Sequence, residues 1–137
     1  MAAQLNQLVA AIRNRLDRVG GVGMVYDSYA APNLTESDFP VLVFSLGGLN
    51  VTTHFSDTID QVTGTVVVSH HTLCADGTAA MRRIMEATYS ALHRSNLTST
   101  DWTSIQLRCV ARGAIVAIGE GMYAQDDTYA LTGNASV

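Results

Sequence analysis

Hydrophobic side chains recur at helical spacing near the start of the chain. One apolar face is formed by Leu5, Leu8, Val9, Ile12, Leu16 and Val19. Gln, Asn, Arg and Asp occupy the opposite face, which is the pattern of an amphipathic helix packed on a core. Gly20 and Gly21 follow directly and are expected to end this helix.

A second helix is expected at about residues 75–93. Its apolar face is formed by Met81, Ile84, Met85, Thr88, Tyr89 and Leu92. Asp76 or Thr78 could cap its first turn by accepting a hydrogen bond from a free backbone N–H group.

The remaining apolar stretches are rich in β-branched residues and read as strands. They are residues 23–27, 40–48, 49–57, 59–73, 103–121 and 122–133. Alternation is clearest at Val62, Gly64, Val66 and Val68, which share one face.

Turn and loop residues separate these strands. Gly47 and Gly48 offer a turn or a bulge, and Asp57–Thr58 offers a polar turn. Gly113 predicts a break in the strand that contains it. Residues 28–39 and 94–102 are expected to be loops.

The resulting order of elements favours an α+β fold. Neighbouring strands joined by short connections predict a mostly antiparallel sheet, and two helices suffice to cover one face. We therefore expect a two-layer sandwich in which residues 1–137 form one domain.

Composition narrows the classes of function. Charged residues make up only 15% of the chain, all eight basic residues are Arg, and the net charge is −4. A weakly charged surface is easily desolvated, which favours contacts between subunits. The negative charge argues against a surface that grips nucleic acid.

No segment predicts export or membrane insertion. The first residues, MAAQLNQLVAAIRNRL, are interrupted by Gln, Asn and Arg and so lack the apolar run of a signal peptide. No other apolar run approaches the length of a membrane span. We expect a soluble protein made in a cytoplasm, with no membrane partner.

The stretch VSHHTLCADG, residues 68–77, raises the question of a metal or catalytic site. His70 and His71 are adjacent on a strand, so their side chains point to opposite faces and cannot hold one ion together. Cys109 and His54 add no partnered spacing. We expect no metal site, and instead a half-exposed histidine pair at a strand end with Cys74 as a small apolar filler.

Catalysis by Cys74 is an alternative. A helix N-terminus could lower the pKa of its thiol, and His71 could act as the base. No oxyanion motif or orienting residue accompanies them, and no phosphate-binding glycine loop is present. We expect no cofactor, and we interpret Asp126 and Asp127 as an acidic turn in the last hairpin.

The order of elements and several short motifs resemble the tail-completion or tail-terminator proteins of long-tailed phages and phage-like particles. The resemblance is carried by VYDSYAAPNLTESDFPVLVFSL, by a V-x-V strand that leads into a helix ending YSALHRSNL, and by DDTYALTGNASV at the end. It covers nearly the whole chain. The SHH after Val68 departs from the more aromatic strand end of that family.

The resemblance implies a structural virion protein with no enzymatic activity. Six copies would form a ring that caps the head-proximal end of the tail tube, ends its growth and joins the head-side connector. DNA would pass through an acidic channel without adhering. Candidate contact residues lie in loops, strand edges and the second helix: His54, Asp57, Asp60, Arg82, Arg83, Tyr123, Asp126 and Asp127.

Two alternatives remain open. One is another neck component of similar size, such as a head-closure or adaptor protein. The other is a small α+β enzyme or ligand-binding domain that uses His71 and Cys74.

Overall fold

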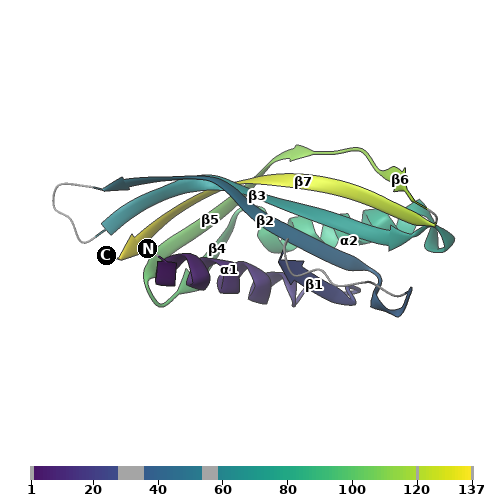
Figure 1. Ribbon diagram of the computed structural model, residues 1–137, viewed down its shortest axis with the longest axis horizontal. Helices are drawn as coiled ribbons and strands as arrows, with labels where there is room; N and C mark the ends of the chain where they lie inside the picture. The colour runs from purple at the N-terminus through teal and green to yellow at the C-terminus, as the bar shows by residue number, and fades with distance from the viewer. Residues whose placement is uncertain (1, 28–35, 54–58, 120, 137) are drawn as a thin grey trace.

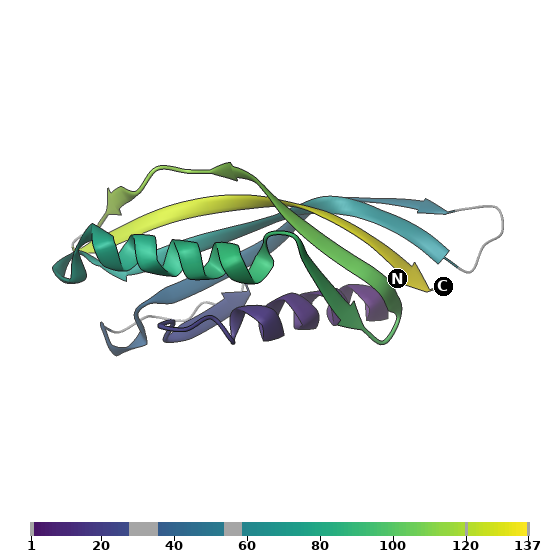
Figure 2. The same ribbon diagram turned by 180° about the vertical axis from the view of Figure 1, so that it is seen from behind.

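The computed structural model describes residues 2–27, 36–53, 59–119 and 121–136. Two helices lie on one side of a strongly curved sheet, and the sheet arches over them (Figure 1; the reverse side is shown in Figure 2). The elements in chain order are α1 (Ala2–Leu16), β1 (Met24–Asp27), η1 (Glu36–Asp38), β2 (Val41–Thr53), β3 (Ile59–Leu73), η2 (Cys74–Asp76), α2 (Gly77–Leu92), β4 (Ser95–Ser99), β5 (Trp102–Arg112), β6 (Val116–Ile118) and β7 (Met122–Ser136).

The seven described strands form one sheet in the order β1-β2-β3-β7-β5-β4, and β6 pairs with β7 where β5 has ended. All strand pairs are antiparallel except β1 with β2. The predicted α+β class, with a mostly antiparallel sheet and two helices on one face, is confirmed.

The core lies between the helices and the sheet. Leu8, Ile12 and Leu16 of α1 are fully buried, as are Met81 and Leu92 of α2. Burial alternates along the strands because successive side chains point to opposite faces. The opposite face of the sheet, which we call the helix-free face, is covered by neither helix.

The N-terminal helix is fixed to the end of the sheet by polar contacts. Trp102 Nε1 donates to the Gln4 carbonyl oxygen at 2.9 Å, and Gln7 Nε2 donates to Asp101 Oδ2 at 2.8 Å. Gly133 makes room for the indole, because a Cβ there would lie 2.7 Å from a Trp102 ring carbon.

Both predicted helices and the strand at residues 59–73 are confirmed, and Val62, Val66 and Val68 are fully buried. The two strands expected at 40–48 and 49–57 are one strand, β2, because Gly47 and Gly48 form a bulge rather than a turn. The strand break at Gly113 is confirmed: β5 ends at Arg112, and β6 begins at Val116.

Two local predictions are wrong. Residues 95–99, expected to be loop, form β4, in which Ser95 and Leu97 are buried. Neither Asp76 nor Thr78 caps α2, since the N-cap residue Asp76 has helical dihedral angles and its side chain makes no capping hydrogen bond. The short helix η2 leads directly into α2, so no extended residue stands at the cap position.

Neither helix in the described ranges is long and apolar enough to cross a membrane.

Candidate functional site

A chain of hydrogen bonds runs across the sheet on the side that faces the helices. His70 on β3 lies opposite Gln125 on β7, and its Nδ1 is 2.8 Å from Gln125 Oε1. The Gln125 Nε2 group donates to Asp127 Oδ1 at 2.6 Å and to the Gly113 carbonyl oxygen at 3.0 Å. These acceptors fix the orientation of the amide, so Nδ1 of His70 is the protonated donor.

Asp127 extends these hydrogen bonds from β7 to β5. Arg112 Nε and Nη2 donate to its two carboxylate oxygens, each at 3.2 Å. Arg112 Nη1 also contacts Glu86 Oε1 on α2 at 2.8 Å, and its guanidinium lies 5.0 Å from the centre of the Tyr89 ring. This buried polar chain, defined as His70, Gln125, Asp127, Arg112 and Glu86, therefore links β3, β7, β5 and α2.

Burial and charge shift several pKa values here. Burial lowers the pKa of His70, against the opposing effect of the Asp127 charge. Burial also raises the pKa of Tyr129, with a further contribution from Asp127. Partial burial opposes the charge on Arg112, but hydrogen bonds to Asp127 and Glu86 dominate and raise its pKa.

The buried polar chain joins structural elements and reaches solvent at Arg112 and Glu86, whereas its inner members are buried. His70 and Asp127 have no exposed surface, and Gln125 is 1% exposed. A substrate would have no access to these groups. Their arrangement fixes β7 and α2 relative to each other, which is a structural role.

The alternative catalytic site would need His71 to act on the Cys74 thiol. His71 points away from His70, as predicted, and burial lowers its pKa despite the nearby charge of Asp126. Cys74 lies in η2, where its backbone N–H donates to the Gly121 carbonyl oxygen at 2.7 Å. No hydrogen bond joins the Cys74 thiol to His71 in the described part of the chain.

The prediction that both histidines are half-exposed is wrong for His70, which is fully buried. His71 is of intermediate burial. Among the described residues, no group of three or more His, Cys, Asp or Glu side chains could hold a metal ion.

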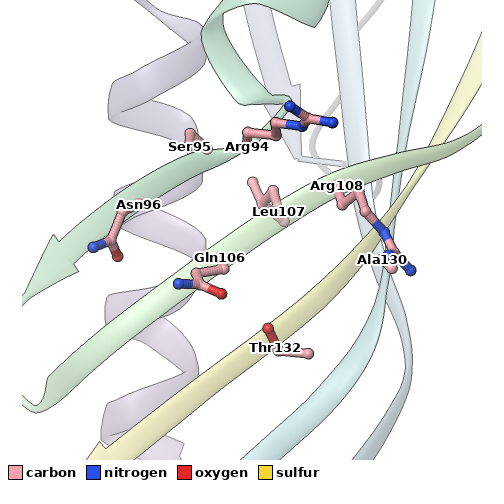
Figure 3. Close-up of a pocket in the computed structure, with 8 residues that line it drawn as sticks. All are labelled: Arg94, Ser95, Asn96, Gln106, Leu107, Arg108, Ala130 and Thr132. Atoms are coloured by element: carbon pink, nitrogen blue, oxygen red, sulfur yellow. The ribbon is translucent and has the colours of Figure 1, made fainter.

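A shallow pocket of about 400 Å³ lies on the helix-free face. Its residues come from the turn before β4 and from β4, β5 and β7, and Figure 3 shows them: Arg94, Ser95, Asn96, Gln106, Leu107, Arg108, Ala130 and Thr132. Gln106 lies opposite Thr132 in the register, and Arg108 lies opposite Ala130. Two guanidinium groups and two amides suit an acidic or polar group of a partner protein.

The predicted contact residues are scattered over the structure. Arg82 and Arg83 are exposed on α2, and Arg82 Nη2 donates to Thr78 Oγ1 at 3.0 Å. Asp60 accepts from Thr53 Oγ1 at 2.8 Å across the β2–β3 hairpin. Tyr123 is half-buried and packs against the core. His54 and Asp57, with the predicted turn at 57–58, lie outside the described residues.

Asp126 and Asp127 do not form a turn. Both lie inside β7, which runs without interruption from Met122 to Ser136, and consecutive residues point to opposite faces. Asp126 is exposed on the helix-free face and accepts from Ser69 Oγ at 2.6 Å. Asp127 is fully buried, so its side chain is not available on the surface of the subunit.

Sequence reasoning missed Arg94, Arg108, Arg112 and Gln125. For Arg108 a signal was present, because Gln106 and Arg108 alternate with the apolar Ile105 and Leu107 and so mark the outward positions of a strand. No local signal marks Arg112 or Gln125, since their partners are distant in sequence.

No protein-family model matches the sequence, and neither does any curated protein. The fold is similar to that of one chain in a solved virion of a native gene transfer agent particle, with a TM-score of 0.67 and 20% sequence identity. The match covers 96% of this chain and 97% of that one. A second solved structure matches 94% of both chains, with a TM-score of 0.67 and 10% identity. Similarity at this level of identity establishes a shared fold.

Proposed function

We propose that this chain is a structural protein of a phage-like virion. The observation that carries the proposal is the match to a chain of a gene transfer agent virion, which spans nearly the full length of both proteins. The resemblance of the sequence to tail-terminator proteins supports the same conclusion independently.

Within the virion we propose the role of a tail terminator. Copies of the chain, six by analogy with the family, form a ring on the head-proximal end of the tail tube, stop its growth and bind the head-side connector. The surface chemistry supports this role, because the helix-free face carries hydroxyl, amide and small apolar groups with few charges: Ser45, Thr63, Thr65, Val67, Ser69, Thr128, Ala130 and Thr132. Surfaces depleted in charge are typical of the core of a protein interface.

We expect DNA to pass through the proposed ring without binding to it. A net charge of −4 per subunit repels phosphates, so a channel through the assembly would let DNA pass without binding it. The chain is not expected to turn over a substrate, because its buried polar groups serve to join strands.

Deletion of the gene from the parent particle tests this role. The expected result is tubes of abnormal length and tails that do not join heads, both corrected by supplying the chain in trans. Tubes of normal length with unattached heads would instead favour a head-closure or adaptor protein. Intact joined particles would contradict both roles.

A further inference from the structure

Two margins of the sheet leave backbone groups without a strand partner. β2 pairs with β1 only from Val41 to Phe44, so its outer edge from Ser45 to Thr53 faces no strand in the described ranges. On the opposite margin β6 pairs with β7 on one side, and no described strand lies on its other side. In both views β6 lies above α2, on the side away from β1 (Figures 1 and 2).

Neither margin is guarded by charge or proline, two of the usual protections of an edge strand. Soluble proteins guard such edges with charged side chains or proline, because unpaired strands otherwise join other chains. Residues 45–53, SLGGLNVTT, contain no charge and no proline, and neither do residues 113–119, GAIVAIG. By contrast, Arg15 and Arg18 flank the edge of β4.

Both margins also expose apolar side chains. Val51 on β2 is 48% exposed, and Val116 and Ile118 on β6 are 50% and 36% exposed. The bulge between Gly47 and Asn50 interrupts the β2 edge, which leaves residues 50–53 as its regular outer part. This segment and the three residues of β6 are similar in length.

We propose that residues 50–53 of one copy pair with residues 116–118 of the next, so that the sheet continues from subunit to subunit. The partner is a second copy because the chain carries both halves of the contact, uncharged and apolar, on opposite margins of one sheet. A contact between two different surfaces of identical subunits is heterologous and generates a ring when the rotation closes. The inference rests on the proposed ring and names the surfaces that close it.

Charge placed on either edge tests the contact. The β2-edge variant is Val51→Lys with Thr53→Lys, and the β6-edge variant is Val116→Lys with Ile118→Lys. The control, Ala10→Lys with Ala79→Lys, adds the same charge at exposed positions of the two helices. Circular dichroism and thermal melts verify the fold of each variant, and light scattering after size exclusion measures its mass.

We expect the wild type and the control to assemble at high concentration, and each edge variant to associate at least tenfold more weakly. A mixture of the two edge variants retains one intact pair of edges, so it should form 1:1 dimers but no rings. Hydrogen exchange at residues 50–53 and 116–118 should slow on assembly of the wild type. A strictly monomeric wild type, edge variants that assemble normally, or a mixture without dimers would each overturn the proposal.

The two proposals can fail separately. Rings that ignore the edge charges would refute these contact surfaces but leave the terminator role standing. If the rings form through these edges but deletion of the gene leaves particles intact, only the terminator role is refuted.

Discussion

Arg112 on β5 holds the carboxylate of Asp127 on β7 with two hydrogen bonds of 3.2 Å, and Asp127 has no exposed surface. The two partners are not equivalent. Arg112 keeps 30% of its side-chain surface exposed and has a second partner in Glu86, whereas Asp127 depends on Arg112 and Gln125.

Removal of Arg112 should therefore cost more stability than removal of the Asp127 charge. We expect Arg112→Gln to lower the free energy of unfolding by about 3 kcal/mol or more, because it leaves a buried anion uncompensated. Asp127→Asn keeps a buried group able to hydrogen-bond and should cost about 1–2 kcal/mol. Urea denaturation measures both values. Equal losses of unfolding free energy in the two variants would contradict the prediction that Asp127 depends more on Arg112 than Arg112 depends on Asp127.

Stability should fall in mild acid. The pKa of His70 is lowered in the folded state by burial, so between the folded value and the unfolded value of 6.5 the unfolded chain binds more protons. The stabilisation is fully present above the unfolded value and is lost as the pH falls below it. His71 shifts in the same direction, also through burial.

His70→Asn should reduce this pH dependence. Its amide nitrogen can take the place of Nδ1, and it cannot be protonated in this range. Urea denaturation between pH 8 and pH 5 should show a smaller loss of stability than in the wild type. If the free energy of unfolding fell with pH as steeply as in the wild type, groups other than His70 would be the cause of the pH dependence.

Two buried hydroxyl groups should be dispensable. Thr72 Oγ1 on β3 and Thr88 Oγ1 on α2 are buried and have no hydrogen-bond partner among the described residues. Valine has nearly the same shape without the polar atom, so Thr72→Val and Thr88→Val should be neutral or stabilise by about 1 kcal/mol. A lower melting temperature in either variant would show that the hydroxyl removed there makes a stabilising hydrogen bond.

A side chain at Gly133 should lower the stability of the protein. A Cβ at this position would lie 2.7 and 2.9 Å from two ring carbons of Trp102. Gly133→Ala should therefore destabilise the protein by about 1–3 kcal/mol. Gly47→Ala is the matched control on β2, because its nearest neighbour would be Thr65 Oγ1 at 3.7 Å. Equal losses in the two variants would show that Trp102 moves aside.

The periodic parts of the fold were predictable from the sequence. The apolar faces of α1 and α2 and the alternation along β3 follow from local spacing, which is set by the geometry of each element. β4 was missed because its five residues, SNLTS, are mostly polar and turn-forming. Pairing with β5 and burial of Leu97 decide its conformation, and neither is visible in the segment itself.

The interior polar groups could not be predicted for a related reason. Asp126 and Asp127 look like a turn because two adjacent acids are rarely placed inside a strand. The partner that neutralises Asp127 is Arg112, 15 residues away in sequence and brought close only by the β5–β7 pairing. The edges of β2 and β6 that lack charge and proline likewise become apparent only when the strand order is known.

Imaging the neck of the parent particle by electron cryomicroscopy tests the central claim most directly. The account predicts a closed ring of this chain between the last ring of the tail tube and the head-side connector, with β2 of each copy beside β6 of the next. Density for this chain elsewhere in the particle, or its absence from a complete particle, would contradict the account.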